Sequence, residues 1–334
     1  MEYRTLGRTG LRLSVLGFGC GNVGGLMIRG VPAERERAVA RAVELGINYF
    51  DTASSYGDGL SEQHLGAALR AVRAPVYVGT KFRLEPGDLR DVGGAVARSL
   101  DASLRRLGTE RVDLLQLHNH ITGRHGEVGV ALDVLGEVVP ALQDLRREGK
   151  LHFYGITALG ETEALHRAID VGVLDTAQVC LNLLNPSAGA EVPVGFPAQD
   201  FGQLLDRARA RGVGAIVIRV LAAGALSGDA ARHHVAVPTV DPIASGPDYA
   251  TDVERARTLQ ALIDEGHAAS LVEAALRFPL ASDAVSTILL GYSSLEQLEL
   301  AAGAVAKGPL SPAALDRLRT LWPRLAGPAR RPGG

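Results

Sequence analysis

Short apolar runs alternate with amphipathic stretches along most of the chain. Each run holds four to seven residues, mainly valine, leucine, isoleucine and alanine. Compact apolar runs of this kind predict buried strands. We expect strands over 15–19, 47–50, 76–80, 112–117, 153–156, 176–181, 215–221 and 286–290.

Segments with apolar residues at helical spacing follow most of these runs. Ser61 is the expected N-cap of the second such segment, because a serine hydroxyl can accept a bond from a free N–H at a helix start. The spacing predicts helices over 32–45, 61–71, 88–107, 131–148, 161–170, 200–211, 252–264, 270–278, 294–306 and 311–321.

Eight strand–helix units in one chain favour an α/β fold of the (β/α)8 TIM-barrel type over an open, doubly wound sheet. The glycine-rich run GFGCGNVGG does not open a helix, and no acidic residue closes a strand about 20 residues later, which argues against a dinucleotide-binding Rossmann fingerprint. Residues 3–14 predict an N-terminal β-hairpin, and the last helices are additions to the barrel. We expect a single domain over 1–322 and a disordered tail over 323–334.

Composition narrows the class of partner. The 334 residues carry a formal charge of −2, which gives no reason to expect nucleic acid or an anionic membrane surface. The polar start MEYRTLGRTG is unlike a secretory signal, and no apolar run approaches ~18 residues. These features predict a cytoplasmic protein with a small-molecule partner; the oligomeric state cannot be read from the sequence.

Chemically active side chains stand at the ends of three neighbouring strands. Asp51, Lys81 and His118 follow strands two, three and four, and Tyr56 lies in the loop after Asp51. In a barrel these strand ends meet at one face. A lysine ammonium stabilises a neighbouring phenolate, and a carboxylate holds the lysine. We therefore expect Tyr56 to exchange a proton with a carbonyl or alcohol oxygen that His118 orients, with hydride from a nicotinamide cofactor, because no side chain can donate one.

The same residues lie in motifs that resemble the aldo-keto reductase family. FDTASSYGDGLSEQHLG is similar to the family signature around its catalytic Asp and Tyr, VGTK to its Lys strand and DLLQLH to its His strand. The similarity keeps the family's order over residues 4–300. It implies reversible reduction of aldehydes or ketones, sugars included, with Tyr56 as proton donor in a tetrad completed by Asp51, Lys81 and His118.

Two alternatives from other classes stay open. His118 and His120 are separated by one residue at a strand end, a spacing that two metal ligands can have, which suggests a metal-dependent hydrolase. No further His and Asp ligands stand out at strand ends. Departures from the family pattern at Ala158, Ile218 and Ser293 suggest a barrel that binds cofactor as a redox sensor or docking subunit with little turnover.

The resemblance also implies which residues bind the cofactor. Thr157 and Gln178 match positions that hold the nicotinamide carboxamide, with Ala158 replacing the usual asparagine. Ile218 stands where the family usually places an aromatic ring under the nicotinamide. The following run, AAGALSG, is similar to the loop around the pyrophosphate, which points to Leu221, Gly224, Leu226 and Ser227.

The end of the last strand bears on the choice between NADP(H) and NAD(H). Family members that prefer NADPH commonly carry a cation there for the 2′-phosphate, and this chain has Ser293 at that position. A hydroxyl bonds a phosphate without the added strength of charge. The family favours NADP(H) and the local residues favour NAD(H), so both cofactors remain open. The expected contacts, at a helix N-terminus, are Gly291, Ser293, Ser294 and Gln297.

Overall fold

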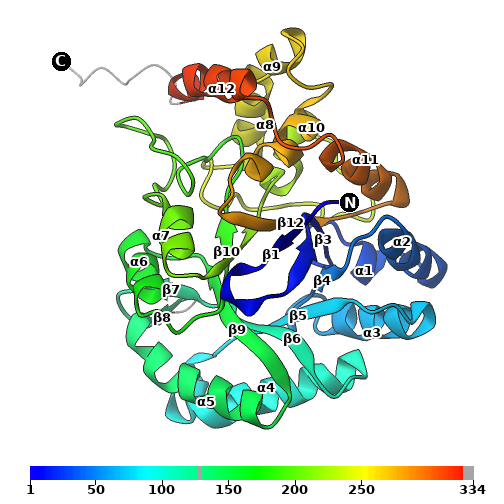
Figure 1. Ribbon diagram of the computed structural model, residues 1–334, viewed down its shortest axis with the longest axis vertical. Coiled ribbons are helices and arrows are strands. Elements are labelled where there is room, and N and C mark those ends of the chain that lie inside the picture. Colours follow the sequence, from blue (N-terminus) through cyan, green and yellow to red (C-terminus); the bar gives the residue numbers. More distant parts are fainter. Residues whose placement is uncertain (127–128, 326–334) are drawn as a thin grey trace.

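Eight parallel strands close into a barrel in the computed structural model, which describes residues 1–126 and 129–325. The strands follow one another around the barrel in chain order (Figure 1). The predicted (β/α)8 fold is therefore confirmed. The barrel strands are β3 (Leu16–Gly19), β4 (Tyr49–Asp51), β5 (Tyr77–Phe82), β6 (Val112–Leu117), β9 (Leu151–Ala158), β10 (Thr176–Cys180), β11 (Gly214–Ile218) and β12 (Val285–Gly291).

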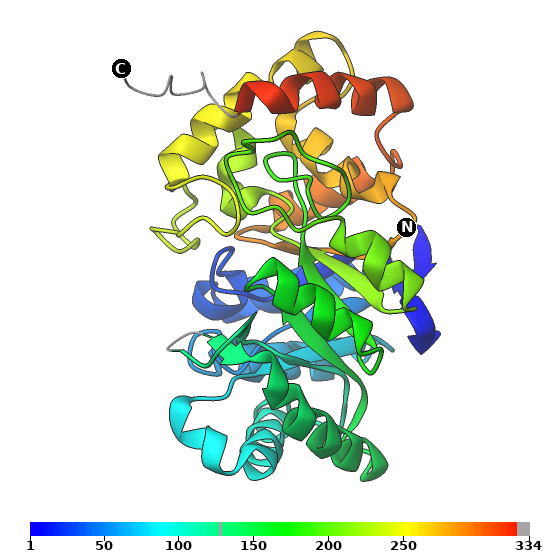
Figure 2. The ribbon, with the colours of Figure 1, turned by 90° about the vertical axis from the view of Figure 1, so that its left-hand side faces the viewer.

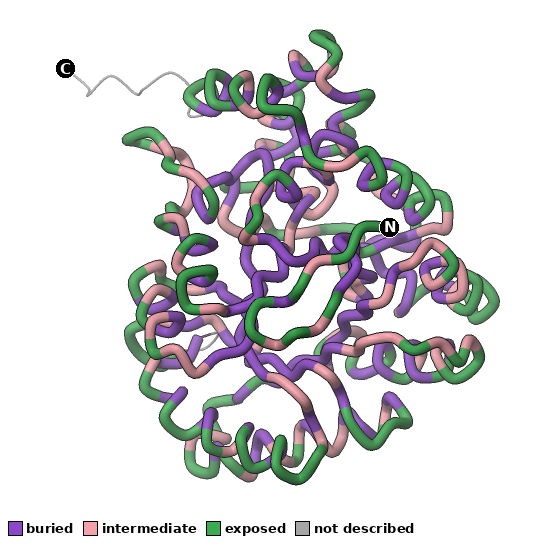
Figure 3. The backbone as a smooth tube through the Cα atoms, viewed as in Figure 1, coloured by how far each residue is buried: buried purple, intermediate pink, exposed green. Residues whose placement is uncertain are grey.

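Helices surround the barrel and bury one face each, so the tube in Figure 3 is buried along the strands and alternately buried and exposed along the helices. They are α2 (Pro32–Glu44), α3 (Leu60–Val72), α4 (Val92–Leu107), α5 (Leu135–Arg147), α6 (Thr162–Asp170), α7 (Leu204–Ala210), α8 (Tyr249–Thr258), α9 (Ala261–Asp264), α10 (Leu271–Arg277), α11 (Leu295–Val305) and α12 (Pro312–Leu325). No helix in the described ranges has the length and apolarity needed to cross a membrane.

The predicted N-terminal hairpin is present, and it covers the end of the barrel where the strands begin. Strands β1 (Tyr3–Thr5) and β2 (Arg12–Ser14) pair antiparallel. The Arg4 guanidinium donates to the carbonyls of Leu280, Ser282 and Val285, and the Arg8 backbone N–H donates to Gly212 at 2.7 Å. Figure 2 shows the hairpin at one end of the barrel and the loop after β11 at the other. The strand ends that carry the candidate residues are thus left uncovered by the hairpin.

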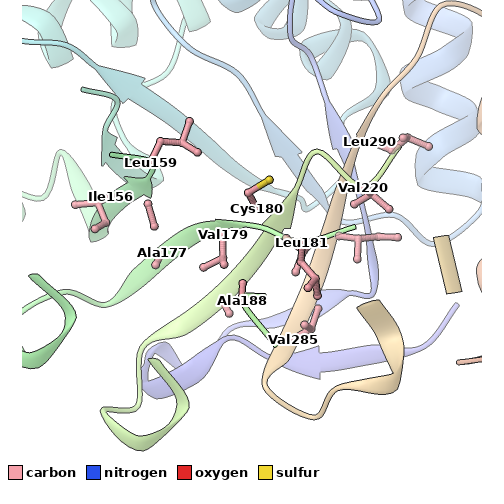
Figure 4. Packing of buried hydrophobic residues seen from close by; sticks show 14 of the residues in the cluster. Ile156, Leu159, Ala177, Val179, Cys180, Leu181, Ala188, Val220, Val285 and Leu290 are labelled. Carbon is pink, nitrogen blue, oxygen red and sulfur yellow. The ribbon is translucent and has the colours of Figure 1, made fainter. Parts of the chain in front are cut away.

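Two apolar clusters hold these layers together. Inside the barrel, Tyr49, Leu114, Ile216 and Leu289 pack on Leu6 of the hairpin region. A larger cluster fills the space between strands and helices, and Figure 4 shows part of it around β9, β10 and β12. Both are expected of a barrel whose strands are covered on both faces.

Some local expectations were wrong. Helix α3 is capped by Gly59 at φ +86°, not by Ser61, because the Ser61 hydroxyl is buried and donates to the Cys20 carbonyl at 2.9 Å. The expected helix over 131–148 begins at Leu135, and short strands β7 (His120–Thr122) and β8 (Gly129–Ala131) with helix α1 (Leu26–Arg29) were not anticipated. Residues 323–325, expected in the tail, belong to α12, and 326–334 lie outside the described residues.

Candidate active site

Three strand ends bring Asp51, Lys81 and His118 together at the face opposite the hairpin. Asp51 ends β4 and pairs in register with Gly79 of β5, so that Lys81 lies two residues farther along, on the same face of that strand as Gly79. His118 directly follows β6, and its backbone N–H donates to the Phe82 carbonyl at 2.8 Å. Tyr56 lies in the turn between β4 and α3. The parallel register therefore gathers these side chains, which are far apart in sequence.

Lys81 is the centre of this group. Its ammonium forms a buried ion pair with Asp51 and donates to the Thr52 carbonyl at 2.7 Å and to the Tyr56 hydroxyl oxygen at 3.3 Å. The ammonium also lies 4.8 Å from the centre of the Tyr56 ring. Burial alone would lower the pKa of Lys81, but Asp51 and Tyr56 outweigh it and the pKa is raised. The lysine is therefore a fixed positive charge beside the phenol.

Asp51 is held on its second oxygen by two further donors. The hydroxyl of Tyr49 donates to Oδ2 at 3.0 Å, and the amide of Gln178 donates to the same oxygen at 2.6 Å. Thr157 in turn donates to Gln178 Oε1 at 3.4 Å. Burial raises the pKa of the Asp51 carboxyl, and Lys81, Tyr49 and Gln178 oppose that rise. A continuous chain of bonds thus joins Thr157 and Gln178 to the Asp51–Lys81 pair.

His118 faces Tyr56 edge-on. The two ring centres are 5.8 Å apart and the planes meet at 84°. Burial, with the positive charges of Lys81 and Arg83, lowers the pKa of His118 to about 3. The imidazole is therefore neutral at physiological pH. In the described parts of the chain, no group of three or more metal-ligating side chains includes His118 or His120.

A cavity of about 470 Å³ opens over this group. Asp51, Tyr56 and His118 line it, and polar side chains of Asn22 and Thr239 contribute to its wall. Four residues predicted to bind cofactor also line it: Thr157, Gln178, Ile218 and Gly291.

A second cavity, of about 420 Å³, lies between the loop after β11 and the start of α11. It brings together five more of the predicted cofactor residues with Gly291: Leu221, Gly224, Ser227, Ser293 and Gln297. Two do not line either cavity. Leu226 is fully buried in the core, and the Ser294 hydroxyl caps α11 by accepting from the Gln297 N–H.

The two cavities are adjacent and share part of their lining. Val23, Gly24, Arg219, Leu289 and Gly291 line both.

Arg219 and Tyr49 were not singled out from the sequence. Both lie within apolar runs, over 215–221 and 47–50, and the sequence does not indicate which way a single polar side chain in such a run points.

Ser293 is engaged within the protein. Its hydroxyl donates to the Gly24 carbonyl at 2.7 Å, and its backbone N–H donates to Gln297 Oε1 at 2.8 Å. Arg232, which lines the same cavity, donates to the carbonyls of Ala223, Val23 and Val237. The polar groups nearest the start of α11 are thus tied to the backbone around the cavity.

Comparison with known proteins agrees with this geometry. The model of the aldo/keto reductase family matches residues 15–323. The chain belongs to the aldo/keto reductase family. It is 30% identical over 303 residues to L-galactose dehydrogenase of Arabidopsis thaliana, covering 90% of this chain and 86% of that protein. It is 29% identical to pyridoxal 4-dehydrogenase of Microbacterium luteolum, covering 89% and 91%.

Solved structures place this aldo/keto reductase in the same fold. The holo form of the aldo-keto reductase AKR11C1 from Bacillus halodurans superposes with a TM-score of 0.71 at 25% identity, covering 97% of this chain and 96% of that one. The protein is an NAD(P)H-dependent oxidoreductase of carbonyl compounds, as its family membership and its dehydrogenase relatives show.

The residues present fit a nicotinamide dinucleotide. Two adjacent cavities can take its two nucleotide halves, and the buried Nη1 of Arg219, a residue that lines both, has no hydrogen-bond partner in the described chain. Backbone at Ala222, Ala223 and Gly224 turns with positive φ beside the second cavity. Non-glycine residues in that conformation are strained, and such strain is typical of ligand-binding loops.

Proposed function

We propose that Tyr56 is the residue that exchanges the proton during reversible reduction of a carbonyl to an alcohol. The observation that carries this proposal is the bond from the Lys81 ammonium to the Tyr56 hydroxyl oxygen, in a cavity that His118 also lines. When bound, the nicotinamide cofactor supplies hydride to the substrate carbon or accepts it.

The other three residues support this proton transfer. Lys81 stabilises the negative charge that remains on Tyr56 once its proton has left, and Asp51 holds Lys81 in place. His118 is neutral, so it can donate one ring N–H to the substrate oxygen without competing for the proton. Thr157 and Gln178 are the proposed ligands of the nicotinamide carboxamide. Hydrogen bonds from Thr157 to Gln178 and from Gln178 to Asp51 connect this carboxamide site to the Asp51–Lys81 pair.

A Tyr56→Phe variant tests the assignment. We expect kcat to fall by about 10²- to 10⁴-fold, the usual contribution of a general acid, while the dissociation constant for the cofactor changes less than about twofold. Tyr77→Phe is the matched control, since Tyr77 begins β5 at the opposite end of the barrel. Unchanged kcat in Tyr56→Phe would overturn the role, and tight cofactor binding without turnover in the wild type would favour the redox-sensor alternative.

We also propose that the protein prefers NAD(H). Two features support this preference. The Ser293 hydroxyl already donates a hydrogen bond to the Gly24 carbonyl, and the Arg232 guanidinium donates to three backbone carbonyls. Neither side chain can bind a 2′-phosphate with these donors unless an existing hydrogen bond breaks. Fluorescence titration with each reduced cofactor is the measurement, and NADPH bound about tenfold more tightly than NADH would contradict the preference.

A small hydroxylated carbonyl or its alcohol is the proposed substrate class. The polar wall formed by Asn22, Thr239 and Asp241 beside Tyr56 supports it, as does the similarity to a protein named L-galactose dehydrogenase. Turnover on aldoses should exceed turnover on alkanals of equal length by at least about tenfold in kcat/KM; the reverse order would exclude the proposed class.

A further inference from the structure

Arg219 directly follows β11 and lies in the wall shared by the two cavities. Its buried Nη1 has no hydrogen-bond partner among the residues that the structure describes. The neighbouring arginines behave differently: Arg29 donates to the carbonyls of Val235 and Asn22, and Arg232 to three carbonyls. Buried guanidinium groups are almost always paired, so an unpaired one beside a cavity indicates a missing ligand.

The backbone holds Arg219 in an unfavourable conformation. Its φ is +60°, in the left-handed region of backbone conformation that residues other than glycine and asparagine rarely adopt. The Arg219 carbonyl accepts from the Asn182 side chain at 3.0 Å and from the Ala222 N–H at 2.8 Å. Two donors therefore fix the turn. Strain maintained in this way is typical of positions at which a side chain must point at a ligand.

The electrostatic surroundings keep the guanidinium without a close counter-charge. Burial lowers the pKa of Arg219, while Cys180, Tyr56 and Asp241 act in the opposite sense and Arg232 adds to the lowering. Arginine nevertheless stays protonated in proteins. A positive charge that burial disfavours is stabilised when an anion enters the cavity, because charge-assisted bonds are strong where water is excluded.

We propose that Arg219 recognises an oxyanion, a phosphate or a carboxylate, at the junction of the two cavities. This inference rests on the proposed function, because a dinucleotide that spans both cavities has its pyrophosphate between them. The oxyanion has two possible sources. One is that pyrophosphate, and the other is a carboxylate or phosphate on the carbonyl substrate beside Tyr56. In both cases the planar guanidinium provides two parallel donors to two oxygens of one group.

The test compares Arg219→Gln, which removes the charge but keeps a polar side chain, with Arg219→Lys, which keeps the charge. Arg209→Gln is the control, since Arg209 is exposed on α7 and is paired with Asp206. Dissociation constants for NADH and NADPH are measured by fluorescence titration, and folding by the thermal transition. Then kcat/KM is compared for butanal against succinate semialdehyde and for glyceraldehyde against glyceraldehyde 3-phosphate.

Each source gives its own pattern. If Arg219 binds the pyrophosphate, Arg219→Gln weakens NADH and NADPH by the same factor, about 10- to 100-fold, Arg219→Lys recovers part of the loss, and the preference between charged and neutral carbonyls is unchanged. If Arg219 binds the substrate, dinucleotide affinity is unchanged in Arg219→Gln. Its kcat/KM then falls by a similar factor for the charged carbonyls and stays unchanged for the neutral ones.

Three results would overturn the proposal. The first is no change in Arg219→Gln in either dinucleotide affinity or kcat/KM, and the second is a loss no larger than that in Arg209→Gln. The third is weaker binding of NADPH with unchanged binding of NADH, which would assign the Arg219 cation to the 2′-phosphate. Failure of the proposed function has a separate signature, because the wild-type protein would then bind neither dinucleotide.

Discussion

The Asp51 carboxylate accepts side-chain hydrogen bonds on both oxygens. Lys81 of the adjacent strand β5 donates to Oδ1, while Tyr49 of β4, the strand of Asp51 itself, and Gln178 of β10 donate to Oδ2. Tyr49 is fully buried inside the barrel, and its hydroxyl donates to Asp51. It is therefore a positioning residue for the Asp51–Lys81 pair and not a catalytic one.

Tyr49→Phe removes one of these bonds while preserving the ring. We expect kcat to fall about tenfold at most, because Gln178 still donates to Oδ2 and the variant loses only part of the ~1.5–3 kcal/mol that a hydrogen bond to a charged group contributes. Cofactor affinity should not change. The control is Tyr154→Phe, which removes a buried hydroxyl bonded to Gln143, away from Asp51. If both variants lower kcat equally, Tyr49 has only a structural role.

The low pKa of His118 has a consequence for acid stability. Burial first, then Lys81 and Arg83, lower it from the ordinary 6.5 to about 3. Between these values the unfolded chain binds a proton that the folded chain does not, so the free energy of unfolding falls as the pH falls from 6.5 toward 3. His118→Gln should remove this loss.

The measurement is urea unfolding at pH 7 and pH 4.5. We expect the wild type to lose more stability than His118→Gln over this interval, by on the order of 2 kcal/mol. His234→Gln, at an exposed position, should behave like the wild type. Equal losses in all three proteins would mean that His118 is not buried in the neutral form.

Single residues were predictable where a strand end fixes their place. Asp51, Lys81 and His118 could be placed from the sequence because every parallel strand delivers its last residue to the same face. Arg219 and Tyr49 could not, because the first depends on a left-handed turn held by Asn182 and the second on which way one side chain points inside the barrel. Ser61 satisfied a rule for helix starts, but its hydroxyl bonds Cys20 instead.

At the scale of elements, helices α3 and α4 approach closely at Gly66. A Cβ added there would lie 2.1 Å from the carbonyl oxygen of Leu107, the last residue of α4. That neighbour is backbone and cannot rotate away. Gly66→Ala should therefore lower the free energy of unfolding by about 1–3 kcal/mol, the usual cost of overpacking.

Gly303 in α11 offers the matched comparison. It is exposed within a helix and a Cβ there meets nothing within 4 Å. Gly303→Ala should leave stability unchanged or raise it by about 0.5–1 kcal/mol through helix propensity. Urea unfolding of both variants is the measurement, and a stable Gly66→Ala would show that α3 can move away from α4.

Long elements followed from the sequence more closely than short ones. All eight barrel strands were predicted, since an apolar run of four or more residues needs only a neighbouring strand on each side. Strands β7 and β8 form a separate two-stranded sheet, with one further bridge from Ile121 to Gly160, and α1 has four residues, so their formation depends on contacts that no local pattern records. The start of α5 was misplaced because Ala131 belongs to β8 and residues Leu132–Val134 form a 3₁₀ turn before the helix.

For the whole molecule, the C-terminal helices pack on the barrel through Trp322, the only tryptophan of the chain. Trp322 lies on α12, is 5% exposed and packs edge-on against Phe278 at a centroid distance of 6.1 Å. Its indole N–H donates to the carbonyl of Leu183, in the loop that follows β10, at 3.1 Å. The helix therefore contacts the backbone of a loop at the same end of the barrel as the candidate active site.

We propose that barrel and C-terminal helices unfold as one cooperative unit, which would make the chain a single domain. Tryptophan fluorescence then reports on α12 alone, and far-ultraviolet circular dichroism on all helices. The two urea transitions should coincide in midpoint and slope, as required for two-state unfolding. Trp322→Phe keeps an aromatic ring but loses the hydrogen bond to the Leu183 carbonyl. Its unfolding transition, followed by circular dichroism, should therefore remain a single step with its midpoint at a lower urea concentration. A fluorescence transition that precedes the dichroism transition would show that α12 separates first and that the barrel folds without it.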